Sequence, residues 1–577
     1  MHNKLKILTI CALIALSISA CRYAPPRTTP AQLPPPAATR TSILLLPLDS
    51  RPVCSTLPQK LGQLAGLNVI LPPKAYLDNY KTPANKEKLW QWLAYNQKFY
   101  SSSLISADIL LHGSLLQARQ SIATPKQEAE LIAALASLNA KQSSSPAALA
   151  DTTAKDCTIF SVIPRLLVSD ELLPDRWYQY QLLRYSELAD MVRISGSFAL
   201  TQKLREIEAK IPPQVLQKYL SQYQQSDRFN TSLLTLASSQ KKLQLVFGQD
   251  DASPIGLPHA SSSRLQELIR SHGLQAKAQL TYGADEIAAL LIAKAYLQQA
   301  QWQPRVYLKF STPQTEQKHM PYMAVSTGTA VRNQLQLIGA RLAQTEDEAD
   351  IILYIHCGDD NALPTQQEAA QLNSLLTAPA AKAKKIALID LSANFEAEEM
   401  FLPLLLQEAA PINKLAAYAG WNTFSNSSGT AIAQAVIFAG RLHQLQQAHA
   451  DEKQVAALYA DNFRFTIERI LEDYYYQKLI HPQLRVYLES FGITPTDLST
   501  EEKQQTEYYI QKRLSLYAEL LWCRLNRTPF YSSTTTDYYL KSLSVGAQLP
   551  WSRIFEVDLQ VWTQFGLSSR KNNQPAS

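Results

Sequence analysis

The stretch ILLLPLDSRP at residues 43–52 decides the fold class of this chain. An apolar run ends there in charged residues, and it is followed by a helical pattern at 58–65, by Gly66 and by a second apolar run at 68–71. Short continuous apolar runs are typical of strands buried on both faces of a parallel sheet, and apolar residues spaced three and four apart indicate a helix. Gly66 stands where a helix C-cap is expected. This opening therefore predicts a β-α-β unit.

The same alternation continues to about residue 420. We expect further strands at 108–111, 158–163, 243–247, 279–282, 305–310, 351–356, 386–389 and 415–418, and further helices at 87–95, 126–138, 264–271, 285–299 and 365–376. Repeated β-α succession predicts an α/β fold with a mostly parallel sheet. The candidate strands suit either a (β/α)8-like barrel with extra strands or two doubly wound halves, and we favour the barrel.

The chain divides into an α/β body at residues 41–435 and a C-terminal region at 436–577. A polar helical stretch rich in Tyr, Gln and Leu interrupts the body near 170–240 and is interpreted as an insertion. Helical patterns at 431–447, 456–476 and 501–526 predict that the C-terminal region is helical and packs on the body.

Composition excludes several classes of protein. The chain has 577 residues, is 46% hydrophobic and carries a net charge of +6, so it can bury a large core and is not globally disordered. Basic residues do not cluster beyond short runs such as 382–385, so we expect no nucleic-acid partner.

The N-terminus predicts secretion and a lipid anchor. Lys4 and Lys6 precede an apolar segment at 7–18, and residues 18–21, Ile-Ser-Ala-Cys, resemble a bacterial lipobox. The resemblance implies a signal peptide at 1–20 and a diacylglyceryl group on Cys21, which would make the membrane a partner. The alternative is an ordinary secretion signal with an incidental cysteine.

A Pro-rich stretch follows the predicted lipidation site. Residues 21–40 resist both helix and sheet, so we expect an extended tether that holds the body off the membrane. The predicted location is the bacterial cell envelope, lipid-anchored and facing outside the cytoplasm. The remaining cysteines lie far apart without a C-x-x-C motif, which favours neither zinc nor redox chemistry; they are Cys54, Cys157, Cys357 and Cys523.

Polar and acidic groups collect where the predicted strands end. Carboxyl ends of parallel strands meet at one edge of a sheet and carry the ligand groups of α/β proteins. The third strand is expected to end in His112-Gly113-Ser114 and the fourth in Pro164-Arg165. The candidate substrate-binding residues at such ends are Asp49, Arg51, Asp285, Glu286, Asp390, Trp421, Asn422 and Asn426.

Asp250 and Asp251 are the candidate catalytic residues. Two carboxyl groups can divide acid and base roles when their surroundings push their pKa values apart, as in glycosidases. The alternative is that one of them only caps the following turn.

Each of the other candidates also has a purely structural interpretation. Asp49 and Arg51 form either a substrate clamp or a buried ion pair. Asp285 stands at the start of the helical pattern at 285–299, where an acidic residue stabilises the helix N-terminus, so we interpret it as a helix cap. Trp421 offers either a stacking face for a sugar or a core side chain.

Metal and cofactor sites are not predicted. His356 with Asp359 and Asp360 carries suitable ligand atoms, but the chain has no HExxH motif and no second nearby histidine there. It also lacks the GxGxxG, Walker and GxSxG motifs.

The strand-end strings together resemble a known family. They are residues 47–52, 71–73, 248–252, 283–286 and 418–423, with 549–556 as a C-terminal block, and in this order they resemble the bacterial domain-of-unknown-function family DUF4127. The resemblance spans about residues 42–560 and implies that the helical C-terminus belongs with the α/β body in one unit. It supports the choice of site and implies no reaction.

Two functions fit these observations. The first is an envelope lipoprotein hydrolase of a glycan or glycan-derived substrate, using Asp250 or Asp251 as acid or base. The second is a non-catalytic lipoprotein that binds a solute or wall fragment in the same cleft. A weaker third is a metal-dependent hydrolase built on Asp49, Asp250 and His356.

Overall fold

The computed structural model describes residues 41–96, 99–100, 102–140, 156–168, 175–359, 363–378, 384–407 and 411–569. The predicted signal peptide, Cys21 and the Pro-rich tether lie outside these residues. Among the described helices, none combines the length and the apolar character that crossing a membrane requires.

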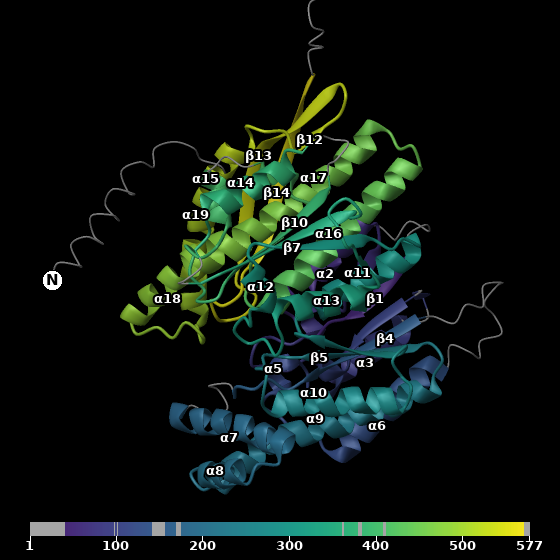
Figure 1. The fold of residues 1–577 in the computed structure, drawn as a ribbon, viewed down its shortest axis with the longest axis vertical. Coiled ribbons are helices and arrows are strands. Elements are labelled where there is room, and N and C mark those ends of the chain that lie inside the picture. Colours follow the sequence, from purple (N-terminus) through teal and green to yellow (C-terminus); the bar gives the residue numbers. More distant parts are fainter. Residues whose placement is uncertain are drawn as a thin grey trace, which may run out of the picture. The chain divides into compact units, whose positions relative to one another are not determined.

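The strands of the α/β body form two parallel sheets (Figure 1). The first has the order β2-β1-β3-β4-β5-β6, and its strands are β1 Ser42–Leu46, β2 Asn68–Ile70, β3 Ser102–Ser106, β4 Asp156–Ile163, β5 Leu243–Gln249 and β6 Ala278–Tyr282. The second has the order β11-β10-β9-β7-β8, and its strands are β7 Arg305–Phe310, β8 Arg341–Leu342, β9 Ile351–Gly358, β10 Lys385–Ser392 and β11 Ala417–Ala419. The predicted α/β class with mostly parallel strands is confirmed.

The two sheets repeat one strand order. Each places its second strand beside its first at one edge and adds the later strands on the other side. This is an order of doubly wound folds, and it corresponds to the two halves that we expected as the alternative to a barrel.

A layer of helices lies between the two sheets (Figure 1). It consists of α2 Thr56–Ala65, α11 Ile287–Ala300, α13 Thr327–Ile338 and α16 Phe424–Gln447. Because side chains alternate along a strand, Ile43 and Leu45 of β1 join this shared core while Leu44 and Leu46 face the opposite side. Leu353 and Ile355 of β9 enter the shared core from the second sheet.

Further helices cover the outer faces of the sheets. The outer face of the first sheet packs against α3 Lys86–Asn96, α6 Pro125–Ala140, α9 Pro213–Ser239 and α10 Leu257–Ser271. The predicted insertion is helical and comprises α7 Arg176–Ser195, α8 Phe198–Glu208 and α9.

The C-terminal region covers the outer face of the second sheet. The helix predicted at 456–476 is present as α17 Glu452–Arg469 and the π-helix η6 Ile470–Ile480, and the one predicted at 501–526 is present as α19 Thr500–Leu525. The helix predicted at 431–447 belongs to α16 in the layer between the sheets, and α18 His481–Ser490 was not predicted. An antiparallel sheet that we did not predict follows them, made of β12 Tyr531–Ser532, β13 Thr536–Gln548 and β14 Asp558–Ser569.

One predicted strand is wrong. Residues 108–111 belong to helix α4 Ala107–Leu111, which Ser106 caps by accepting a hydrogen bond from the Ile109 N–H at 3.4 Å. The strand is β3, the preceding segment, which is rich in serine. A short apolar run fits a buried helix as well as a strand, so periodicity alone could not separate them. His112-Gly113-Ser114 therefore follows a helix rather than a strand.

Candidate functional site

A cavity of ≈ 220 Å³ opens at the carboxyl ends of the first sheet. Its walls come from both halves of the body and from the C-terminal block. The charged lining residues are Arg51, Arg119, Arg165, Asp250, Asp251, Asp285 and Arg553, and the other lining residues that matter here are Tyr322, Asn422, Thr423, Ser425, Asn426 and Phe555.

Asp250 and Asp251 follow β5 and enter this cavity. The Asp250 N–H donates to the Ile163 carbonyl at 3.3 Å, and the Asp251 carbonyl accepts from the Leu166 N–H at 2.8 Å, so the backbone is fixed against the end of β4. Asp250 Oδ2 lies 2.5 Å from Arg119 Nη2. Asp251 Oδ2 lies 3.6 Å from Arg165 Nη1, and 26% of the Asp251 side chain is exposed.

These surroundings push the two pKa values apart. Burial alone would raise the pKa of Asp250, but the attraction of Arg119 and Arg165 outweighs it and holds that pKa below its usual range. Burial, reinforced by the negative charge of Asp250, raises the pKa of Asp251 to about 6. One carboxylate therefore stays ionised while its neighbour can carry a proton near neutral pH.

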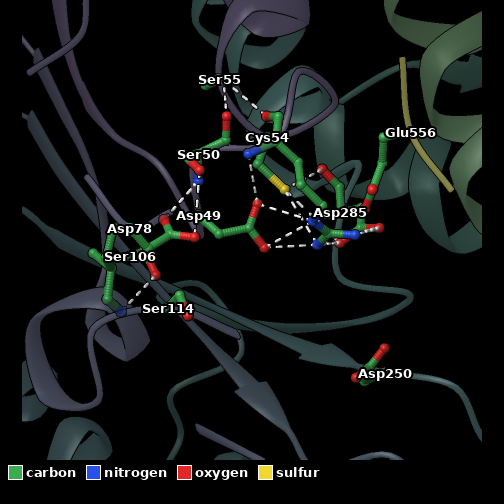
Figure 2. A network of polar contacts seen from close by, with 12 residues as sticks. Asp49, Ser50, Cys54, Ser55, Asp78, Ser106, Ser114, Asp250, Asp285 and Glu556 are labelled. Carbon is green, nitrogen blue, oxygen red and sulfur yellow. Dashed lines mark hydrogen bonds and ion pairs between the residues drawn. The ribbon is translucent and has the colours of Figure 1, made fainter. Parts of the chain in front are cut away.

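Arg51 lines the cavity and joins two loops through Asp49 and Asp285, the two partners labelled in Figure 2. Its Nε lies 3.0 Å from each carboxylate oxygen of Asp49, and its Nη2 lies 2.6 Å from Asp285 Oδ1. All three side chains are buried. Of the two interpretations of Asp49 and Arg51, this geometry matches the buried ion pair. Figure 2 shows Asp250 apart from this network.

Asp285 does not cap the helix that follows it. Both of its carboxylate oxygens bind Arg51, and α11 begins at Ile287 with no side-chain cap on its first turn. The capping interpretation is therefore wrong. Asp285 still lines the cavity, so it connects the Arg51 network to the open space.

The C-terminal block, residues 549–556, contacts the loop after β1. Trp551 Nε1 donates to Ser50 Oγ at 2.8 Å. The Ser50 N–H in turn donates to Asp78 Oδ1 at 2.8 Å (Figure 2). Burial, followed by the charge of Asp49, raises the pKa of Asp78 to about 8. Arg553 lies over the ring of Trp551, 4.6 Å from its centroid, and also lines the cavity. The first and last parts of the described chain thus build one wall.

The family model "Protein of unknown function (DUF4127)" matches residues 43–560. The chain belongs to this family. No curated protein and no solved structure matches the chain. Every residue that lines the cavity falls within the DUF4127 match.

Several predicted site residues of this DUF4127 protein do line the cavity, and others do not. The lining ones are Arg51, Asp250, Asp251, Asp285, Asn422 and Asn426. Asp49 is buried, does not line the cavity and binds Arg51. Glu286 is fully buried, where burial raises its pKa to about 8, and its Oε1 accepts from Gln334 at 3.4 Å.

Asp390 and Trp421 lie away from the cavity lining. The Asp390 carboxylate accepts hydrogen bonds from the Phe401 and Leu402 N–H groups at 2.7 and 2.8 Å, where it caps α15 Leu402–Gln407. Trp421 is 5% exposed, and its ring centroid lies 6.1 Å from that of Phe555. Its neighbour Asn422 has a φ of 59°, and this turn sends Asn422 to the cavity while the indole stays in the core.

The candidate metal ligands have other partners. His356 is buried, and its Nε2 lies 3.0 Å from the Glu399 carbonyl oxygen. Asp359 pairs with Lys318 at 2.5 Å. Asp360 lies outside the described residues. Within the part of the chain that the structure describes, no three His, Cys, Asp or Glu side chains group as a metal site.

The sequence did not reveal the arginines that partner the two aspartates. Arg165 follows the predicted fourth strand, but its residue type and position do not distinguish it from the other polar residues at strand ends. Arg119 follows the short helix α5 Leu115–Ala118, and no sequence signal pointed to it. Tyr322 precedes α13 in a loop that is pinned to the site, since its carbonyl accepts from the Ala252 N–H at 3.0 Å.

Proposed function

We propose that this DUF4127 protein is a cell-envelope lipoprotein hydrolase that acts on a glycan or glycan-derived substrate. The observation that carries the proposal is the Asp250–Asp251 pair, whose pKa values diverge within one cavity. Paired carboxyl groups with separated pKa values are the arrangement that glycoside hydrolysis uses.

The two carboxyl groups suggest a division of labour. Asp251 donates its proton to the leaving oxygen as the glycosidic bond breaks, and water adds to the sugar carbon. One proton of that water then restores Asp251. Asp250 stays ionised beside Arg119 and stabilises the positive charge that develops on the sugar ring. Arg51, Asp49 and Asp285 hold the loops that carry the cavity wall.

Other lining groups match the surface of a sugar. Asn422 and Asn426 carry amides, and Thr423 and Ser425 carry hydroxyls, which suit the hydroxyl groups of a glycan. Tyr322 is 42% exposed and offers an aromatic face, with its ring centroid 6.3 Å from that of Phe395. Tyr322, Phe395 and Asn422 all have positive φ values, and such backbone strain clusters at functional sites.

The location forms part of the same proposal. The signal peptide, Cys21 and the tether would place the cavity at the cell surface or in the periplasm, where glycans of the wall or of the diet are available. Mass spectrometry of the membrane fraction should find Cys21 with a diacylglyceryl group, and Cys21→Ala should release the protein. An unmodified Cys21 in the mature protein would contradict the lipoprotein assignment.

Activity is tested on purified protein with a panel of wall and dietary glycans. We expect Asp251→Asn to lower kcat by about 10²–10⁴-fold, the usual contribution of a general acid or base. Asp227→Asn is the matched control, because Asp227 is an aspartate paired with Arg264 outside the cavity lining. Full activity of both Asp250→Asn and Asp251→Asn, or an inactive wild type across the panel, would defeat the proposal.

The second candidate is a binding protein without turnover. The pairing of Arg51 and Asp250 with protein groups favours it, since these side chains are already held in a preformed cavity. A ligand present at 100 times its Kd would then stabilise the fold by about 2.7 kcal/mol. Recovery of that ligand unchanged after long incubation would support binding over hydrolysis.

A further inference from the structure

Two arginines approach the catalytic candidates from neighbouring loops. Arg119 Nη2 binds Asp250, and within the described residues the buried Arg119 Nε has no hydrogen-bond partner. Arg165 Nε donates to the Leu167 carbonyl oxygen at 2.8 Å, which fixes the plane of its guanidinium. Both side chains line the cavity, with 19% of Arg119 and 22% of Arg165 exposed.

The positive charge of Arg165 is only weakly compensated by the described residues. Its carboxylate partner, Asp251, is 3.6 Å away, which is longer than a normal hydrogen bond. Burial, with the repulsion of Arg119, lowers the pKa of Arg165, so the site disfavours two adjacent guanidinium groups. Protonation of Asp251 as a general acid would leave Arg165 only the attraction of Asp250, which Arg119 already binds.

The other two arginines of the cavity are already occupied. Arg51 binds both Asp49 and Asp285 with its terminal nitrogens. Arg553 binds Glu556 through Nε at 2.8 Å and through Nη2, and it stacks on Trp551. Among the four cavity arginines, Arg165 is thus the one whose terminal nitrogens form no hydrogen bond with the described residues, and its ion pair with Asp251 is long.

We infer that Arg165, with Arg119 beside it, binds an anionic substituent of the substrate, either a carboxylate or a phosphate carried on a sugar. The planar guanidinium presents paired donors that match both groups. The inference rests on the proposed function for the sugar, whereas the anion site itself is a binding property. An anion at Arg165 would also favour the protonated form of Asp251, so the charge of the substrate would help to prepare the acid.

Binding is tested with three probes on the mature full-length protein in detergent. These are D-glucuronate, inorganic phosphate and neutral D-glucose, measured by calorimetry and thermal shift. We expect glucuronate or phosphate to bind at least tenfold more tightly than glucose. Preference for glucuronate identifies a carboxylate as the substituent, and preference for phosphate identifies a phosphoryl group. Equal affinity for all three probes would overturn the inference.

Substitutions of Arg165 test whether this residue is the one that binds the anion. Arg165→Gln should weaken anion binding at least tenfold, and Arg165→Lys should retain part of it because the charge remains. Arg264→Gln is the matched control, since Arg264 is an exposed arginine paired with Asp227 outside this cavity. Unchanged anion affinity in a folded Arg165→Gln variant would contradict the assignment.

The test separates this inference from the proposed function. Asp251→Asn should lower kcat by about 10²–10⁴-fold yet bind the anion at least as tightly as the wild type, because a negative charge next to Arg165 is lost. Anion binding without turnover of any glycan would defeat the hydrolase and leave the anion site standing. Turnover of neutral glycans without anion binding would defeat the anion site and leave the hydrolase standing.

Discussion

Arg51 and Asp285 are 234 residues apart in the chain, yet the two terminal nitrogens of Arg51 bind the two carboxylate oxygens of Asp285 at 3.0 and 2.6 Å. Their strands, β1 and β6, are not neighbours, since β3, β4 and β5 lie between them in the sheet. The loops after these strands therefore converge above the carboxyl edge of the sheet. The Asp49–Arg51–Asp285 bridge closes one side of the cavity.

The Asp49–Arg51–Asp285 bridge should contribute strongly to the stability of the half of the body that contains the first sheet. Arg51→Met leaves two carboxylates buried without their cation, so we expect the free energy of unfolding to fall by about 3–5 kcal/mol. Denaturant titration measures the change. The control is Arg485→Gln, which removes an exposed pair with Glu489 and should cost no more than about 0.5 kcal/mol. Similar losses for both variants would show that the bridge has no special role.

Gly283 should tolerate no side chain. Its φ is 124°, and an added Cβ would lie 2.0 Å from Glu286 Oε1 and 2.5 Å from Ser425 Oγ. Gly283→Ala should therefore destabilise the fold strongly and distort the cavity wall. Gly196→Ala is a matched control, because Gly196 has a φ of 62° with open space around it, and it should cost only about 1–2 kcal/mol. Thermal melting compares the two, and equal melting temperatures would refute the steric argument.

The pH dependence of hydrolysis should follow Asp251. Its pKa of about 6 means that the protonated fraction falls tenfold for each pH unit above that value. If Asp251 is the general acid, kcat/KM declines above about pH 6. The pKa of Asp250 lies below its ordinary value of 3.8, so the acid limb should appear only below that pH. A profile that is flat between pH 5 and pH 8 would exclude Asp251 as the acid.

Glu286 should make the fold less stable at alkaline pH. Burial, reinforced by the charges of Asp285 and Asp250, raises its pKa from 4.5 to about 8 in the folded chain. The folded state therefore holds a proton that the unfolded state has lost, and stability falls as pH rises from 4.5 to 8, by about 1.4 kcal/mol per unit. Glu286→Gln should remove this pH dependence. The free energy of unfolding of the variant should therefore increase relative to that of the wild type as pH rises. Parallel stability curves for the two proteins would contradict the prediction.

Strand prediction succeeded where burial on both faces left a continuous apolar run. β9 and β10 are of this kind, and both were placed correctly. β3 reads Ser-Ser-Leu-Ile-Ser, and Ser103 and Ser106 are buried in the sheet interior, so its composition concealed it. The antiparallel β13 and β14 were missed because their half-exposed residues lack such a run.

The candidate site was predicted in part, because strand ends fix the position of a residue but not the direction of its side chain. Chain order and strand ends fix where Asp250, Asp251 and Asp285 lie, because parallel strands share one edge. The direction of a side chain after the strand ends depends on the turn, which is why Trp421 enters the core and Asn422 the cavity. The pairing of Arg119 with Asp250, across 131 residues, leaves no local trace in the sequence.

The hydrogen bond from Trp551 to Ser50 spans 501 residues. During synthesis the loop after β1 emerges among the first folded segments, and its partner emerges almost last. The cavity therefore cannot be complete until the C-terminal block has packed against this loop. A chain that ended before residue 549 would contain every strand of both parallel sheets and both catalytic candidates, yet it would lack Arg553 and Phe555 of the cavity lining and the Trp551 that binds Ser50.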